Sequence, residues 1–232
     1  MNKKKNNLNQ SAKDPFWFRE CFLMPMPIGI KVVNLRELLQ ALREVSDAVI
    51  YYHLFQSRLA VSQPAVEFPN DFALWAAVSL QDSALAEKLS SFDPLSYDNL
   101  GQVRLAMVDI LEEYLWDLPF VPWARSGFEF HFCEASTVVI RSEIVAHNLR
   151  DFYQALTKVG LDAMYYHFFE ARWRLEKPID DFSYWIENNF NLPELVAAIR
   201  GIDLYFYNLR EIRNTLLDLI RQYVGDACGQ SE

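Results

Sequence analysis

The sequence predicts an all-α protein with one or two short β-strands, built from two tandem five-helix repeats that pack about a pseudo-twofold axis. Two observations lead to this fold class. A shift of 114 residues along the 232-residue chain places 16 of the 45 residues from 16 to 60 on identical residues, where average composition gives about three by chance. Apolar residues in both halves also recur at intervals of three and four, which is typical of amphipathic helices.

The duplication sets the expected boundaries. After a loop that is four residues shorter in the second half, the matching shift falls to 110. Two motifs recur in this way: Tyr51-Tyr52-His53 as Tyr165-Tyr166-His167, and Asp71-Phe72-x-x-Trp75 as Asp181-Phe182-x-x-Trp185. We therefore expect a disordered basic tail over 1–15, repeats over 16–117 and 128–224, a linker over 118–127 and a polar tail over 225–232.

The first two helices of each half follow from apolar spacing and a boundary residue. Leu35 to Val45 carry leucines at helical intervals, and Ser46 can cap a second helix that runs to about Leu59. In the second half Gly160 stands at the position of Ser46 and ends the preceding helix.

The next three helices are marked by caps and prolines. Asn70 or Asp71 can cap a short helix, Asp82 caps another, and Asp93 before Pro94 ends it, because the residue before a proline is pushed out of the helical region. A long amphipathic helix is expected from about Tyr97 to Trp116. In the second half, Asn191 and Pro193 open the fourth helix and Gly225 ends the last.

Each half also begins with a short strand. Phe128, Phe130 and Phe132 alternate with polar residues, a period of two that indicates a strand. Phe16-Trp17-Phe18 is its counterpart, and Pro25 and Pro27 are expected to keep that strand short.

Charge and composition exclude several classes of function. The formal charge is −9 and both halves are acidic, which argues against nucleic acid binding, and no apolar run is long enough to cross a membrane. Three cysteines at no metal-like spacing favour the cytoplasm. The sequence contains no phosphate loop or dinucleotide fingerprint and indicates no particular cofactor. The expected partner is a protein or a small molecule, and the expected state a monomer or homodimer.

The duplicated pattern resembles a known family. The aromatic start, Asn34-Leu35-Arg36-Glu37, the Tyr-Tyr-His motif and the Asp-Phe-x-x-Trp motif are similar to an uncharacterised domain-of-unknown-function family of bacterial and archaeal helical proteins. The resemblance covers nearly the whole body and implies no catalytic residue.

The candidate catalytic residues are His167, Glu170 and Arg174. Their spacing of i, i+3 and i+7 predicts one helical stripe with an imidazole, a carboxylate and a guanidinium, which could bind a metal or perform acid–base chemistry. The structural alternative is that His53 and His167 lie at a helix–helix contact with one ring nitrogen hydrogen-bonded.

A weaker candidate for a metal site lies near the start of the second half. His131 belongs to the predicted strand, and Glu143 and His147 are expected one helical turn apart. Neither the zincin spacing nor the signature of di-iron bundles is present. The structural alternative is an alternating strand with one face in solvent.

Polar residues that occur in both halves form the candidate ligand-binding set. If the two copies of these polar residues face each other, they could line a shared groove for an anion or a sugar. The structural alternative is that each half needs the same caps and buried ion pairs. The set is His53, His167, Arg58, Arg172, Tyr51 and Tyr165.

Two functional hypotheses follow. The first is a non-enzymatic cytoplasmic binding or accessory protein with a pseudo-symmetric polar and aromatic groove, and with Trp116, Phe120 and Trp123 as an exposed patch. The alternative is a metal-binding or acid–base enzyme with its site around His167 in the second repeat. The discriminating feature is whether the site uses residues found once or residues found twice.

Overall fold

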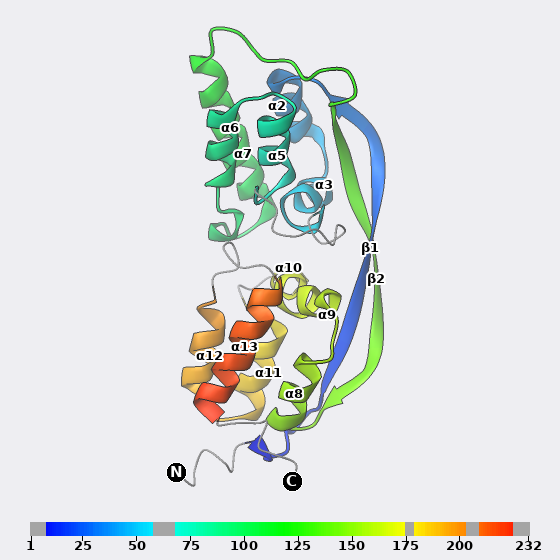
Figure 1. Cartoon of the computed structure of the whole chain (residues 1–232), viewed down its shortest axis with the longest axis vertical. Coiled ribbons are helices and arrows are strands. Elements are labelled where there is room, and N and C mark those ends of the chain that lie inside the picture. The colour runs from blue at the N-terminus through cyan, green and yellow to red at the C-terminus, as the bar shows by residue number, and fades with distance from the viewer. Residues whose placement is uncertain (1–7, 58–67, 175–178, 203–208, 225–232) are drawn as a thin grey trace. The chain divides into compact units, whose positions relative to one another are not determined.

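A computed structural model describes residues 8–57, 68–174, 179–202 and 209–224 of the chain (Figure 1). Within these ranges, no helix has both the length and the apolar character that a membrane span needs.

The predicted fold class is wrong, because the strands are long. β1 (Phe16–Val32) and β2 (Phe130–Ala146) each contain 17 residues and pair as a two-stranded antiparallel sheet (Figure 1). The protein is therefore mixed α and β, and not an all-α pair of five-helix repeats about a pseudo-twofold axis. The middle of each strand is largely exposed, so it lacks the alternation that marks a half-buried strand.

β1 also continues through two prolines that were expected to end it. Each strand of a two-stranded sheet has one free edge, and Pro25 and Pro27, two residues apart, lack their N–H groups on the same edge. Prolines whose missing donors face the free edge leave the ladder to β2 intact.

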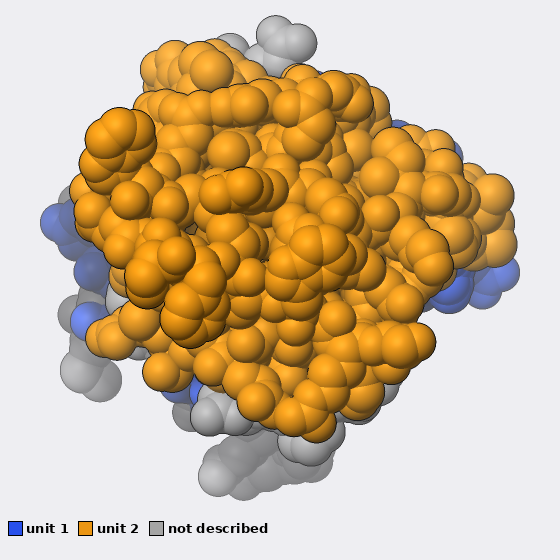
Figure 2. All heavy atoms as spheres, turned by 90° about the horizontal axis from the view of Figure 1, so that it is seen from above, with its two compact units in different colours: residues 1–22, 138–232 blue, residues 23–137 orange. Residues whose placement is uncertain are grey.

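The chain divides into two compact units that do not coincide with the two halves of the sequence. Unit 1 contains residues 1–22 and 138–232, and unit 2 contains residues 23–137 (Figure 2). The predicted linker, residues 118–127, lies inside unit 2. Each unit thus combines the helices of one half with the strand start of the other.

The helices of unit 2 follow the predicted order, and several begin at the expected caps. The Asn70 side chain accepts a hydrogen bond from the Ala73 amide at 2.9 Å, and Asp82 accepts one from Leu85 at 3.0 Å. The helices are α2 (Leu35–Glu44), α3 (Asp47–Tyr51), the π-helix η1 (Tyr52–Gln56), α5 (Asp71–Val78), α6 (Ser83–Ser90), the 3₁₀-helix η2 (Pro94–Ser96) and α7 (Leu100–Asp117).

The helices of unit 1 repeat this order. Asn148 and Asp180 cap α8 and α11 through backbone amides at 2.8 and 2.7 Å. The expected stop at Gly225 lies outside the described residues. The helices are α8 (Leu149–Leu156), α9 (Leu161–Tyr165), the π-helix η3 (Tyr166–Glu170), α10 (Ala171–Arg174), α11 (Asp181–Asn189), α12 (Pro193–Arg200) and α13 (Leu209–Val224).

The segment before β1, predicted to be a disordered tail, is held against unit 1 over residues 8–15. Leu8 is buried, and the Asn9 side chain accepts a hydrogen bond from Arg150. The Ala12 amide donates to the His147 carbonyl at 2.7 Å. The apolar Leu8 and these polar contacts fix a segment whose composition is otherwise typical of a tail. Residues 1–7 are outside the described part.

Candidate functional site

His167 in η3 is buried and has both ring nitrogens hydrogen-bonded. The Nδ1 atom lies 2.7 Å from Oδ2 of Asp181 at the start of α11. The Nε2 atom accepts a hydrogen bond from the backbone N–H of Arg19 in β1 at 2.8 Å. His167 therefore joins a helix of the second half to the strand of the first half, inside unit 1.

His53 in η1 makes the same three-part contact inside unit 2. Its Nδ1 atom lies 2.7 Å from Oδ2 of Asp71, and its Nε2 atom accepts the backbone N–H of Cys133 in β2 at 2.9 Å. The two histidines thus occupy equivalent positions in two equivalent contacts.

A tryptophan one helical turn after each of these aspartates binds the chain just before the same strand. The Trp185 indole N–H donates to the Asp14 carbonyl at 2.7 Å, and the Trp75 indole N–H donates to the Phe128 carbonyl at 2.9 Å. We call His167, Asp181 and Trp185, with His53, Asp71 and Trp75, the strand clamps.

Phenylalanine rings of the strands fill the space beneath the clamps. Phe16 packs on His167 with ring centroids 4.8 Å apart, and Phe130 packs on His53 at 4.7 Å. The duplicated aromatic start of each half is therefore core, packed against the helices of the other half.

The clamp geometry determines the protonation of His167. Because Nε2 accepts an N–H, the ring proton is on Nδ1 and is donated to Asp181. Burial lowers the pKa of His167 below its ordinary value of 6.5, and the hydrogen bond to Asp181 opposes this only in part. The imidazole is neutral and has no nitrogen left for a metal or a substrate proton.

The predicted stripe of His167, Glu170 and Arg174 is divided between two contacts. Glu170 accepts a hydrogen bond from the Tyr165 hydroxyl at 2.7 Å. Arg174 instead donates to Oδ2 of Asp181 at 2.7 Å, and its guanidinium lies 4.8 Å from the Tyr166 ring centroid. His167 and Glu170 lie inside the π-helix η3, whose helical phase differs from that of an α-helix. His167 and Arg174 therefore meet at Asp181, whereas Glu170 bonds Tyr165.

The other duplicated candidates are structural or outside the described residues. Tyr51 and Tyr165 are buried, and each packs against a phenylalanine four residues later. Arg172 lies near the buried Asp180, where burial raises the pKa of the carboxyl and the charge of Arg172 opposes this rise. Arg58 lies outside the described residues.

The candidate metal ligands do not come together. His131, Glu143 and His147 are exposed, and Glu143 belongs to β2. Strand residues four apart are separated by roughly 13 Å, so the helical turn expected for Glu143 and His147 does not form. No cluster of three or more His, Cys, Asp or Glu side chains in the described ranges could hold a metal ion.

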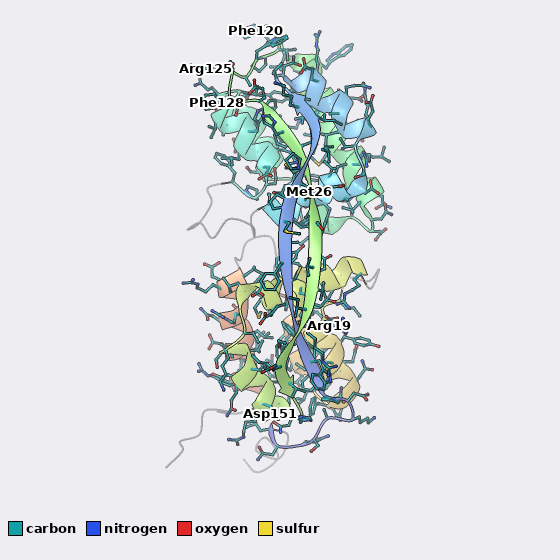
Figure 3. The ribbon with its side chains drawn as sticks, turned by 90° about the vertical axis from the view of Figure 1, so that its right-hand side faces the viewer. Arg19, Met26, Phe120, Arg125, Phe128 and Asp151 are labelled. Carbon is teal, nitrogen blue, oxygen red and sulfur yellow. The ribbon has the colours of Figure 1, made fainter. Side chains whose placement is uncertain are left out.

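An open pocket of about 540 Å³ lies in unit 1, between the start of β1 and α11. Arg19, which Figure 3 labels on β1, lines it. The aromatic part of the wall comes from Phe16, Trp17, Tyr166, Tyr184 and Trp185. The polar part comes from Asp14, Arg19, His167, Arg174, Asp181, Asn188 and Asn189.

Part of the polar wall is already occupied by internal hydrogen bonds. Asn189 accepts the Asp14 amide and donates to the Trp185 carbonyl, and Asp181 receives both His167 and Arg174. Asn189, Asp181 and His167 hold the pocket in shape and are not its binding groups, whereas Arg174 is exposed and uses one of its five N–H donors on Asp181.

A second group of lining residues is exposed and occurs in only one half of the sequence. Tyr184 stands where the first half has Leu74, Asn188 where it has Val78, and Arg19 where the second half has Cys133. We call Asp14, Trp17, Arg19, Tyr184 and Asn188 the rim. None of these was a sequence candidate, although a search for polar residues that occur in only one half could have found them.

The predicted exposure of the three aromatic side chains at and after the end of α7 is confirmed. Trp116 at the end of α7 is 89% exposed, and Phe120 and Trp123 are also exposed. Figure 3 labels Phe120 near Arg125 and Phe128 at one end of unit 2.

The chain belongs to the family of unknown function DUF5752, whose model matches residues 13–221. This confirms the resemblance drawn from the duplicated motifs. A search of curated proteins finds no match. Among solved structures, the chain is similar to OrfY from Thermoproteus tenax, with 26% identity, a TM-score of 0.75, and coverage of 93% of this chain and 98% of that one.

Proposed function

We propose that the protein is a non-enzymatic cytoplasmic binding protein and that the unit 1 pocket holds a small polar molecule. Of the two partner classes that the sequence leaves open, a protein and a small molecule, the pocket favours the second. Its size and its mixture of aromatic and polar walls are typical of small-molecule sites.

One observation carries this proposal. The rim residues occur in only one half of the sequence, whereas the strand clamps beneath them occur in both halves. The strand clamps are needed in both units to hold a strand, so their chemistry is explained by folding. Folding gives no such reason for Arg19 or for exposed Tyr184 in unit 1 alone. A site that belongs to one half only accounts for them.

The alternative, an acid–base or metal enzyme around His167, has less support. Both nitrogens of that imidazole are used by the clamp, and Glu170 and Arg174 point to different partners. The proposed compartment rests on the free thiols of Cys21 and Cys133, which are unpaired in the described structure.

The test is a ligand-observed NMR screen of small polar compounds against wild type and a rim variant. Tyr184→Leu with Asn188→Val gives α11 the residues found at the equivalent positions of α5. The matched control, Leu74→Tyr with Val78→Asn, makes the reverse exchange on the exposed face of α5. We expect hits that bind wild type and the control but not the rim variant. Equal binding to both variants, or no hits with wild type, would contradict the proposal.

A further inference from the structure

We propose that the ligand of the unit 1 pocket is an anion with a ring or another flat apolar part, and that its phosphate or carboxylate binds between Arg19 and Arg174. This inference rests on the proposed function, because it names the chemistry of the same pocket.

The two arginines bring an excess of positive charge to the His167 end of the pocket. Both arginines line the pocket together with His167. Burial is the main cause that lowers the pKa of His167, and the positive charge of each arginine lowers it further. The carboxylate that faces them is Asp181, and it is already bound to His167 and Arg174. Asp181 therefore pairs with Arg174 and not with Arg19.

The guanidinium of Arg19 is available to a ligand. Its backbone N–H is fixed on His167, which anchors the residue, while its side chain is exposed and forms no ion pair with any residue in the described ranges. Arg174 uses an Nη2 N–H on Asp181, and a guanidinium has five N–H donors in all. Planar guanidiniums match the oxygens of phosphates and carboxylates in bidentate geometry.

The remaining acid of the rim lies away from this charge. Asp14 precedes β1 and is held through its backbone by Trp185 and Asn189. The extended strand from Phe16 to Arg19 separates its backbone from that of Arg19 by roughly 10 Å or more. Among the described residues, its carboxylate forms no ion pair with Arg19 or Arg174.

The aromatic side chains of the rim favour a ligand with a flat apolar group. Trp17 is 40% exposed and Tyr184 is 48% exposed, so each leaves part of a large aromatic ring in water. Arg141 lies over one face of the Trp17 ring, 3.3 Å from its centroid, so that ring is held in place. A ligand ring packed on these side chains would remove apolar surface from water while its anionic group stays with the arginines.

The test uses four probes and isothermal titration calorimetry: phenyl phosphate, benzoate, inorganic phosphate and the neutral benzyl alcohol. We expect phenyl phosphate or benzoate to bind most tightly, inorganic phosphate to bind more weakly, and benzyl alcohol not to bind. The order of the first two identifies the anionic group. Binding should weaken as salt rises, because the contact is between charges.

Three variants locate the contacts. Arg19→Gln, which keeps the backbone N–H on His167, should weaken aryl anion binding about tenfold or more. Arg125→Gln removes an equally exposed arginine of unit 2 and should change nothing. Tyr184→Leu should weaken phenyl phosphate but leave inorganic phosphate unchanged.

The outcomes separate this inference from the proposed function. If benzyl alcohol binds as tightly as phenyl phosphate, or if Arg19→Gln binds like wild type, the anion assignment is wrong while pocket binding stands. If no probe binds but the NMR screen finds neutral ligands that need the rim, the inference fails and the proposed function survives. If neither experiment finds a ligand, both are wrong.

Discussion

Units 1 and 2 hold a strand with the same side chains but present different surfaces around it. In each unit a histidine accepts a strand N–H, an aspartate orients that histidine, and a tryptophan N–H binds a carbonyl two residues before the strand begins. Above this frame, α11 of unit 1 exposes Tyr184 and Asn188, whereas α5 of unit 2 exposes Leu74 and Val78.

This difference separates the residues that folding requires from the residues that are available for binding. A duplicated residue in a strand clamp has a structural reason in each copy, so its chemistry alone is no sign of catalysis. A rim residue has no counterpart in the other unit and is exposed. The two faces therefore differ in the residues that a ligand would meet, on the same backbone frame.

The largest expected effect comes from removing a clamp histidine. His167→Ala leaves a cavity, a buried Arg19 amide without an acceptor and an Asp181 carboxylate with one partner fewer. We expect a loss of about 3 kcal/mol in the free energy of unfolding. The measurement is urea unfolding together with hydrogen exchange at the Arg19 amide.

His53→Ala is the matched variant in unit 2 and should produce a similar loss. In that variant the Cys133 amide should lose protection from exchange, while the Arg19 amide keeps it. A change below about 0.5 kcal/mol in both variants would show that the clamps do not hold the strands.

A second comparison concerns the caps of α5 and α11. Asn70 accepts the Ala73 amide and donates to the Leu89 carbonyl at 3.0 Å. Its counterpart Asp180 accepts the Ser183 amide, but its Oδ2 has no hydrogen-bond partner in the described ranges. Burial raises the pKa of Asp180, and nearby Arg172 opposes this.

Exchanging these two residues should shift stability in opposite directions. Asn70→Asp should cost about 2 kcal/mol at pH 7, because it buries a carboxylate oxygen against a carbonyl. Asp180→Asn should be neutral or should stabilise by about 1 kcal/mol. Unfolding curves at pH 7 measure both, and a large loss in Asp180→Asn would mean that the charge of Asp180 is needed.

The free energy of unfolding should depend on pH through the protonation of His167 in the unit 1 clamp. The pKa of His167 is lowered in the folded protein, so below about pH 6.5 the unfolded chain binds a proton that the folded chain does not. The contribution of neutral His167 to the free energy of unfolding is complete above the pKa that this residue has in the unfolded chain. It is lost as the pH falls towards the folded pKa, at up to about 1.4 kcal/mol per pH unit.

The measurement is the free energy of unfolding between pH 5 and 8 for wild type and His167→Gln. The difference between the two proteins should fall as the solution is acidified from pH 7, because glutamine does not titrate. A difference that stays constant over this range would contradict the neutral assignment.

Sequence reasoning was reliable where the cause was local. Asp82 and either Asn70 or Asp71 were predicted as caps, because a cap needs only a short polar side chain before a helix, and Asn70 is the residue that caps α5. The exposed Trp116 followed from its place at the edge of a loop. The long strands were missed because residues 23 to 30 of β1 have no buried face to impose a period of two.

The site itself depended on contacts that a repeat does not specify. The duplication identifies His53 and His167 as equivalent, but it does not say that each accepts an N–H from the strand of the opposite half. The π-helix η3, which contains both His167 and Glu170, likewise has no clear sequence signal. Of the candidates chosen for reactive side chains, the two histidines therefore proved to be structural and Arg174 lines the pocket, while the rim contained residues that no motif marks.

The smallest expected effect on stability is the most informative about the rim. Tyr184→Leu with Asn188→Val changes two exposed side chains, so the free energy of unfolding should move by less than about 0.5 kcal/mol. Asn188 does donate to the Tyr184 carbonyl at 2.7 Å, but this bond is on the helix surface, where water can replace it. Urea unfolding of this variant and of Leu74→Tyr with Val78→Asn makes the comparison. A loss above about 1.5 kcal/mol in the first variant alone would mean that the rim stabilises unit 1, and its presence in one half would then need no ligand to explain it.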